Sequence, residues 1–153
     1  WIGSHDRQEH YHSAGVTIMK ESHCLPTLEH LVTQQLIDKY SEVSGDYNPI
    51  HIDQKFAKET HFGGTIAHGM LVAAFISEMM TMAYGMDWVR SGKLKLRFKS
   101  PVRPGEQVFT HGVVARIRTL TTTSKEISCV VGVRHGENGE SAITGDAIVV
   151  QTS

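Results

Sequence analysis

The sequence has little cysteine and almost no net charge. Only two of its 153 residues are cysteines, Cys24 and Cys129, and their spacing fits no zinc or redox motif. We therefore expect reduced thiols in or near a core, and a disulfide between them is the less favoured alternative. Acidic and basic side chains nearly cancel, giving a formal charge of -1. This balance argues against a protein that binds nucleic acid through bulk charge.

Long apolar runs are also missing. No segment approaches the roughly 20 apolar residues that cross a bilayer, so no membrane partner is expected. Cysteine usage favours a cytoplasmic location. Residues 1–14 are polar, start with Trp1 and lack the apolar stretch of a signal peptide. We interpret 1–14 as a tail or an expression remnant, in which His10 and His12 are not a metal site, and 15–153 as a single domain.

Helical spacing predicts three helical segments in the first part of the chain. Residues 33–44 repeat apolar side chains at helical intervals, with Thr33 as N-cap and Gly45 suited to the left-handed residue after the last turn. One or two further helical turns are predicted for residues 54–60. Residues 68–84 are apolar on nearly every side, so we expect a helix that a sheet encloses.

The rest of the sequence has the alternation and β-branched content of strands. Residues 93–99 place leucine and phenylalanine on one face and lysine and arginine on the other. Strands are predicted at residues 16–22, 28–32, 93–99, 108–117, 124–134 and 142–151. The last four would form a meander, which makes the chain an α+β domain.

The segment SGDYNPIHID, residues 44–53, combines stiff turn chemistry with an acid and a base. Pro49 fixes its own φ and pushes Asn48 toward an extended conformation. One interpretation is that Asp46 and Asn48 only form side-chain-to-backbone turns, and that His51 begins the next element. The other is that Asp46 and His51 divide acid and base chemistry near neutral pH.

The apolar segment that follows this loop favours the chemical interpretation. Because this segment is apolar and follows shortly after the loop, the loop is expected to border a dry pocket. The segment begins His68-Gly69-Met70. Gly69, in the first helical turn, offers an unobstructed backbone N–H with the helix dipole behind it. Such a donor suits a developing oxyanion on a carbonyl group.

At this point the sequence resembles the MaoC-like dehydratases, the (R)-specific enoyl-CoA hydratases. The pattern is an aromatic residue, a small residue, then G-D-x-N-P-[ILV]-H, with H-G-M about seventeen residues further on. The residues that match it are Tyr40, Ser44, Gly45, Asp46, Asn48, Pro49, Ile50, His51, His68, Gly69 and Met70. The segment LKLRFKSPVRPGE is also similar to the strand and turn that follow the central helix in that family. The resemblance extends from Leu25 to about Gln151.

The resemblance implies a hotdog fold, in which a curved antiparallel sheet wraps a long central helix. It also implies reversible hydration of trans-2-enoyl thioesters to (R)-3-hydroxyacyl thioesters. Asp46 and His51 would activate the water, and the Gly69 N–H would bind the thioester oxygen. Family members usually form dimers, so a homodimer or a dimer of dimers is expected. The substrate would be an acyl-CoA or an acyl-carrier-protein thioester.

The remaining expected site residues have lesser roles. Asn48, His68 and Ser77 are expected to support the catalytic pair. The acyl pocket is predicted to involve residues of the apolar helix, namely Met70, Val72, Phe75 and Ile76. Arg97, Lys99 and Arg103 are weaker candidates for contacts with coenzyme A phosphates, since a solvated or edge-protecting basic face is the preferred explanation.

Two alternatives to the hydratase stay open. A hotdog acyl-CoA thioesterase would need a carboxylate or nucleophile that acts at the thioester carbon. A non-catalytic domain that binds acyl thioesters would not need Asp46 and His51. The sequence contains no nucleotide-binding loop, zinc motif or nucleophile elbow, so we expect no metal and no cofactor apart from the coenzyme A of the substrate.

Overall fold

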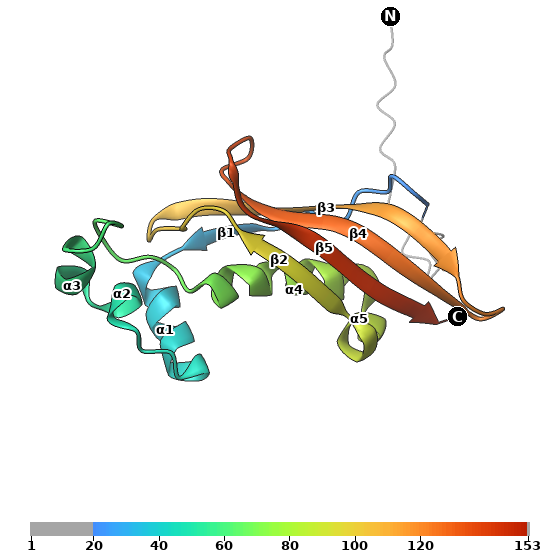
Figure 1. Cartoon of the computed structure of the whole chain (residues 1–153), viewed down its shortest axis with the longest axis horizontal. Coiled ribbons are helices and arrows are strands. Elements are labelled where there is room, and N and C mark those ends of the chain that lie inside the picture. Colours follow the sequence, from blue (N-terminus) through green and yellow to red (C-terminus); the bar gives the residue numbers. More distant parts are fainter. Residues whose placement is uncertain (1–19, 153) are drawn as a thin grey trace, which may run out of the picture.

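A five-stranded antiparallel sheet with one long helix against its concave face forms the frame of the molecule (Figure 1). The structure is a computed structural model, and it describes residues 20–152. The predicted tail, residues 1–14, and the start of the predicted strand 16–22 lie outside the described residues. The described end of that strand, 20–22, is a turn in which Ser22 has φ 67°, so the strand prediction is wrong there.

Most of the predicted helices are confirmed. The first of them is α1, Gln34–Ser44, whose N-cap Thr33 accepts a hydrogen bond from the Leu36 N–H. Gly45 follows with φ 75°, the left-handed conformation that glycine adopts without steric cost. The later helices are α2, Pro49–Ile52; α3, Gln54–Lys58; α4, Gly69–Tyr84; and α5, Met86–Ser91.

The strands match the predicted segments, but their order in the sheet differs from a four-strand meander. They are β1, Glu29–Val32; β2, Lys93–Phe98; β3, Glu106–Thr119; β4, Ser124–His135; and β5, Ser141–Thr152. The order is β1-β3-β4-β5-β2, so only β3, β4 and β5 form the meander. In β2, Lys95 is opposite Asp146 of β5, a favourable cross-strand charge pair that alternation within one strand cannot reveal.

The core lies between α4 and the sheet. Ile76, Met79 and Met80 of α4 are fully buried, and the inward residues of β3, β4 and β5 cover them. The expectation that α4 is buried on nearly every side is wrong. Met70 is 64% exposed and Met82 is 62% exposed, so one side of the helix is open in the single chain.

The two cysteines are free, but they differ in burial. Cys129 lies in the core, where its sulfur is 3.5 Å from the Tyr84 hydroxyl oxygen. Cys24 is exposed, so the prediction of a core or near-core thiol is wrong for that residue. It lies in an isolated bridge with Val113, outside the layer that α4 covers.

The segment that holds α1, α2 and α3 gathers at one end of the sheet, beside the first turn of α4 (Figure 1). The main chain ties it to α4 and to the turn before β3. Ile66 donates to the Ile50 carbonyl at 3.2 Å, and Ala67 donates to the Val102 carbonyl at 2.8 Å. Among the described helices, none is long and apolar enough to span a membrane.

Candidate active site

The loop after α1 is shaped by consecutive side-chain-to-backbone hydrogen bonds. The Asp46 carboxylate accepts the Asn48 N–H at 3.1 Å, and the Asn48 side-chain oxygen accepts the Ile50 N–H at 3.1 Å. Asn48 is thereby the N-cap of α2, with Pro49 at the first helical position. Both residues therefore have the turn role that sequence reasoning had considered. These bonds leave the second carboxylate oxygen of the exposed Asp46 for other contacts.

The turn of α2 directs His51 toward the loop that precedes α4. Its Nδ1 lies 2.8 Å from the Ile66 main-chain oxygen. A carbonyl oxygen only accepts, so Nδ1 carries the proton and the neutral ring keeps its lone pair on Nε2. Burial lowers the pKa of His51 below its ordinary value and outweighs the opposing effect of the Ile66 hydrogen bond. The neutral imidazole is therefore favoured at neutral pH.

His68 is buried beneath this pair and holds the acidic loop in place. Its Nε2 donates to the Asp46 main-chain oxygen at 3.0 Å and lies 3.2 Å from the Ser41 hydroxyl oxygen. The ring of His68 stacks on that of His51, with centroids 3.8 Å apart and planes 29° from parallel. A histidine in this position supports the loop that carries Asp46 without facing solvent.

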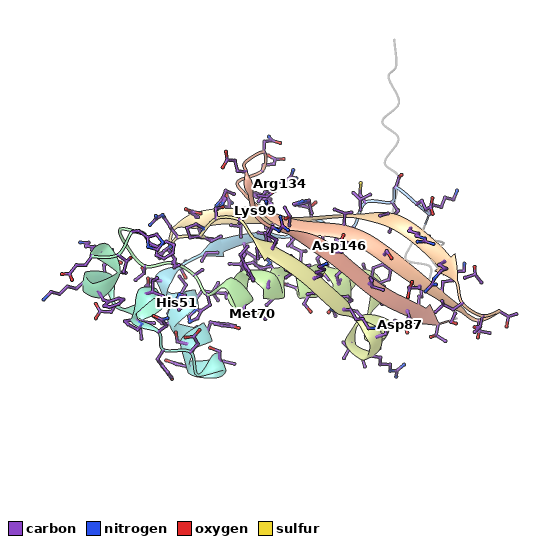
Figure 2. The ribbon with its side chains drawn as sticks, in the orientation of Figure 1. His51, Met70, Asp87, Lys99, Arg134 and Asp146 are labelled. Atoms are coloured by element: carbon purple, nitrogen blue, oxygen red, sulfur yellow. The ribbon has the colours of Figure 1, made fainter. Side chains whose placement is uncertain are left out.

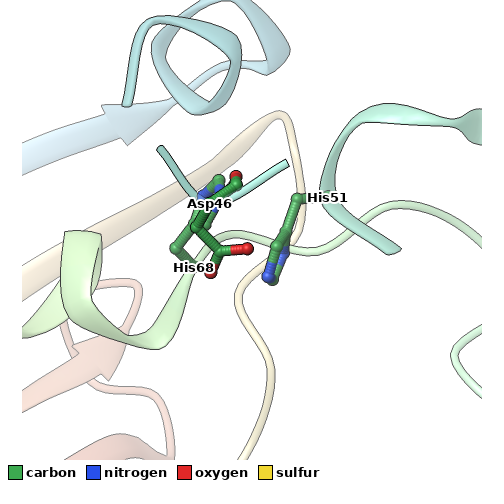
Figure 3. A group of neighbouring side chains, drawn as sticks. All are labelled: Asp46, His51 and His68. Atoms are coloured by element: carbon green, nitrogen blue, oxygen red, sulfur yellow. The ribbon is translucent and has the colours of Figure 1, made fainter. Parts of the chain in front are cut away.

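Asp46, His51 and His68 thus form one cluster, which Figure 3 shows from the side of the carboxylate. One ligating atom of each lies within 4.8 Å of the others. A shared metal ion would need converging lone pairs. His68 donates its Nε2 proton to the protein backbone, and His51 donates its Nδ1 proton to the Ile66 carbonyl, so each ring keeps one nitrogen lone pair. The remaining nitrogen of His68, Nδ1, has no hydrogen-bond partner among the described residues.

Gly69 begins α4 directly beside the cluster, and its lack of a side chain is required by a close neighbour. A Cβ at this position would lie 2.9 Å from the Phe98 ring. The N-terminus of α4 has no side-chain cap, so its first N–H groups have no partner from a capping residue. An unobstructed N–H at a helix N-terminus is a favourable site for negative charge.

A pocket of about 340 Å³ opens between this helix terminus and the end of β2. It is lined by His51, Phe62, Ile66, Ala67, Gly69, Val72, Phe98, Lys99, Ser100, Pro101, Val102, Ala142 and Ile143. Most of these side chains are apolar, and the histidine and the helix N-terminus supply polar groups at one wall. The pocket can therefore hold an acyl chain whose polar end is next to His51.

The structure places only one of the four predicted acyl-pocket residues at the pocket. Val72 lines the pocket, whereas Met70 is exposed on the side of α4 away from the sheet (Figure 2). Phe75 is buried further along α4, where its ring stacks on His30 at 3.9 Å. Ile76 is fully buried in the core. Of the four, only Val72 lines the pocket beside His51 and Gly69.

Ser77 lies away from the cluster and joins two helices. Its hydroxyl oxygen accepts the Trp88 ring N–H at 2.9 Å, which links α4 to α5. Eight residues separate it from Gly69, a distance of ~12 Å along a helix. The observed contact gives Ser77 a packing role in the single chain.

The three basic candidates lie in different places. Lys99 lines the mouth of the acyl pocket, and it also borders a groove with Arg97 along β2 and β5. Arg103 borders another groove, beside Gly64 and Gln54. Lys99 is therefore the basic residue nearest to the pocket lining, and Arg97 extends its positive charge along the strand.

Sequence reasoning missed several residues that shape the site. The Ile66 carbonyl orients His51, and the Ser41 hydroxyl contacts His68. Phe62 and Phe98 form apolar walls of the pocket. A backbone carbonyl has no sequence signal, and Ser41 only marks one small residue within an amphipathic helix. Phe98 was assigned to the apolar face of its strand, but its approach to Gly69 required the folded chain.

Comparison with known proteins relates the sequence to a described family. The model of the MaoC like domain matches residues 18–135. The chain is 32% identical over 111 residues to the (R)-specific enoyl-CoA hydratase of Aeromonas caviae, covering 72% of this chain and 79% of the relative. It is 33% identical over 111 residues to the 3-hydroxybutyryl-CoA dehydratase of Methylorubrum extorquens, covering 72% and 67%.

Solved structures share the fold. The (R)-hydratase of A. caviae superposes with a TM-score of 0.75 at 24% identity, covering 90% of this chain and 100% of that chain. An R-hydratase from Pseudomonas aeruginosa gives a TM-score of 0.74 at 23% identity, covering 88% and 83%. These similarities confirm the predicted hotdog fold, in which the sheet wraps the long helix α4.

Proposed function

Because the chain belongs to the MaoC-like dehydratase family, we propose that it hydrates trans-2-enoyl thioesters reversibly to (R)-3-hydroxyacyl thioesters. The family and its relatives support a hydratase or dehydratase of acyl thioesters. One observation mainly supports the specific reaction, the hydration of an enoyl thioester. Asp46 and the neutral His51 present ligating atoms within 4.8 Å of each other beside an apolar pocket.

His51 supplies the base in this proposal. The Ile66 carbonyl holds the Nδ1 proton, so Nε2 carries a lone pair, and no described residue hydrogen-bonds to it. A water held between Nε2 and the Asp46 carboxylate would donate one hydrogen bond to each. As the water oxygen attacks C3 of the enoyl group, its proton passes to Nε2. The carboxylate orients the water by accepting its second hydrogen.

Gly69 stabilises the charge that this attack creates. The π electrons of the C2–C3 double bond move toward the thioester carbonyl, which becomes an enolate oxygen. The N–H of Gly69, at the uncapped N-terminus of α4, would donate to that oxygen. His51 then returns its proton to C2, which completes the addition of water and restores the neutral ring.

The apolar pocket and the basic residues beside it, Lys99 and Arg97, support one orientation of the substrate. The acyl chain would lie among apolar residues such as Val72, Phe62 and Phe98. The carrier would extend past Lys99 toward Arg97, where positive charge can meet coenzyme A phosphates. The names of two relatives refer to coenzyme A and to acyl-carrier-protein thioesters, and the phosphopantetheine arm is common to both carriers.

We also propose that two chains form a two-fold dimer. The strands β1 and β2 are the edges of the sheet, and Phe98 of β2 is 53% exposed in the single chain. Met70 and Met82 add exposed apolar surface on α4. Unpaired edges and apolar surface of this kind are commonly covered by a second copy.

The test of this function is turnover of trans-2-enoyl-CoA esters of graded chain length. Loss of the conjugated enoyl absorbance, with a hydroxyacyl-CoA as product, supports the proposal. Release of free coenzyme A without any hydroxyacyl product would favour the thioesterase alternative. Binding of the esters without turnover would favour the non-catalytic alternative.

A further inference from the structure

A second group of reactive side chains includes Ser100, which lines the acyl pocket. Ser100 follows β2, Glu106 begins β3, and His135 ends β4. The Ser100 hydroxyl oxygen is 2.7 Å from His135 Nε2, and His135 Nδ1 is 2.7 Å from a Glu106 carboxylate oxygen. Three elements far apart in the sequence thus bring a serine, a histidine and a carboxylate together through two consecutive hydrogen bonds.

The donors and acceptors of these two hydrogen bonds fix the direction in which a proton can move from Ser100 to His135. A carboxylate only accepts, so His135 Nδ1 donates to Glu106 and leaves its lone pair on Nε2. Nε2 therefore accepts the hydroxyl proton of Ser100. A competing acceptor, the Ser141 carbonyl, lies further away at 3.4 Å. This order of nucleophile, base and orienting carboxylate is the arrangement that activates serine for acyl transfer.

The position of Ser100 gives this arrangement access to a substrate. Ser100 lines the acyl pocket together with His51 and Gly69. It also lines a shallow surface pocket that contains Glu106 and His135. The histidine and glutamate side chains are 25% and 33% exposed, so water can reach them.

We propose that Ser100, His135 and Glu106 form a second catalytic site, which transfers acyl groups from thioesters or activated esters to Ser100 and then to water. The Ser100 oxygen bonds to the acyl carbon, the carbon–sulfur bond breaks, and the hydroxyl proton passes through His135 to the leaving thiolate. A water molecule then attacks the acyl-serine with His135 as base, the bond between the acyl carbon and the Ser100 oxygen breaks, and His135 returns the proton to that oxygen as the carboxylic acid leaves. No oxidant, reductant or other co-reactant is needed.

This activity is separate from hydration, because it requires no double bond in the acyl chain and does not use Asp46. It would supply the nucleophile that the thioesterase alternative lacked at the sequence level. The competing explanation is structural: the same two hydrogen bonds fasten the turn after β2 to the ends of β3 and β4. A covalent mark on Ser100 separates the two explanations.

The experiment treats the full chain with a fluorophosphonate, a probe for activated serines, and locates the adduct by peptide mass spectrometry. A saturated substrate, butyryl-CoA, is assayed in parallel for thiol release. We expect the adduct on Ser100, and loss of both adduct and thiol release in Ser100→Ala. Glu106→Gln keeps a hydrogen-bond acceptor for His135 but loses the charge, and we expect labelling to slow by about 10²-fold.

Ser141→Ala is the matched control, because it removes a hydroxyl from the neighbouring strand and leaves the three residues intact. We expect its labelling rate to equal that of the native chain. The proposal is overturned if the folded native chain shows no adduct on Ser100. It is also overturned if Glu106→Gln is labelled at the native rate, or if Ser100→Ala releases thiol as fast as the native chain. None of these readouts depends on enoyl-CoA hydration.

Discussion

The Nδ1 atom of His51 donates a hydrogen bond to the main-chain oxygen of Ile66, 2.8 Å away. This contact selects one tautomer of the neutral ring and leaves Nε2 as the basic atom beside Asp46. It also connects the two loops that meet at the start of α4, because Ile66 in turn donates its N–H to the Ile50 carbonyl. The proposed catalytic base is therefore oriented by a main-chain carbonyl.

The rate of hydration should fall on the acid side with a midpoint below 6.5, the ordinary pKa of histidine. Burial lowers the pKa of His51, so the ring stays neutral until the pH falls below that value. Protonation of Nε2 then removes the lone pair that accepts the proton of water. The measurement is kcat/KM for an enoyl-CoA between pH 4.5 and 8, on protein that remains folded. An acid limb centred clearly above 6.5 would contradict this assignment.

The same shift predicts a loss of stability as the pH falls below about 6.5. The unfolded chain binds the His51 proton at the ordinary pKa, whereas the folded chain binds it only at lower pH. Acid therefore favours unfolding through this residue. His111 has a pKa lowered by burial as well, so His51→Gln should reduce the acid loss of stability without abolishing it.

Asp46→Asn should separate the chemical role of Asp46 from its role in the turn. The asparagine oxygen can still accept the Asn48 N–H, so we expect the free energy of unfolding to change by no more than about 1 kcal/mol. The hydration rate should fall by roughly 10²–10³-fold, since the neutral amide oxygen orients the water and stabilises its developing positive charge less well than a carboxylate does. Rates are measured at saturating enoyl-CoA.

The matched control for that variant is Asp53→Asn. Asp53 is also an exposed loop aspartate whose side chain accepts backbone N–H groups, here from Lys55 and Phe56 at the start of α3. Its replacement should leave hydration near the native rate. If Asp46→Asn keeps a rate within threefold of the native chain, Asp46 has only the turn role.

Gly69→Ala should impair hydration while the chain stays folded. The added Cβ would lie 2.9 Å from the Phe98 ring, which must then move within the pocket wall beside the proposed oxyanion donor. We expect kcat/KM to fall by about 10²-fold, because the backbone N–H remains but the displaced ring moves the substrate carbonyl away from it. Gly64→Ala is the control, because its Cβ would meet Gln54 at 3.5 Å, an ordinary contact. Equal rates for the two variants would show that the substrate is not held close against Gly69.

The protein should be a dimer, or a dimer of dimers, in solution. The exposed edge strand β2 and the exposed side of α4 leave apolar surface that a second copy can cover. Light scattering at micromolar concentration measures the mass directly, and the calculated mass of one chain is 17.0 kDa. A fully active particle of that single-chain mass would show that the second copy is not needed.

Local patterns predicted the elements of this fold better than their arrangement. Thr33 and Gly45 marked both ends of α1 because capping is determined by a few adjacent residues. The short helix α5 was missed, since six residues after Gly85 carry little periodicity. The position of β2 beside β5 depends on pairing between segments about 50 residues apart, which alternation within a strand does not encode.

The candidate site shows the same division. Asp46, His51 and Gly69 became candidates because acid, base and donor lie in short motifs with their own turn chemistry. The apolar pocket residues were assigned from one helix, and three of the four point elsewhere because a pocket is lined by several elements. Ser100, Glu106 and His135 come from three separate strand ends, so their alignment became visible only in the folded chain.

The most direct test of the central claim is chiral analysis of the product that the native chain forms from trans-2-butenoyl-CoA. Addition of water by Asp46 and His51, with the acyl chain held in one pocket beside Gly69, presents a single face of the double bond to the water. The account predicts (R)-3-hydroxybutyryl-CoA as the hydration product. An (S) or racemic product, or no 3-hydroxyacyl thioester at all, would contradict it.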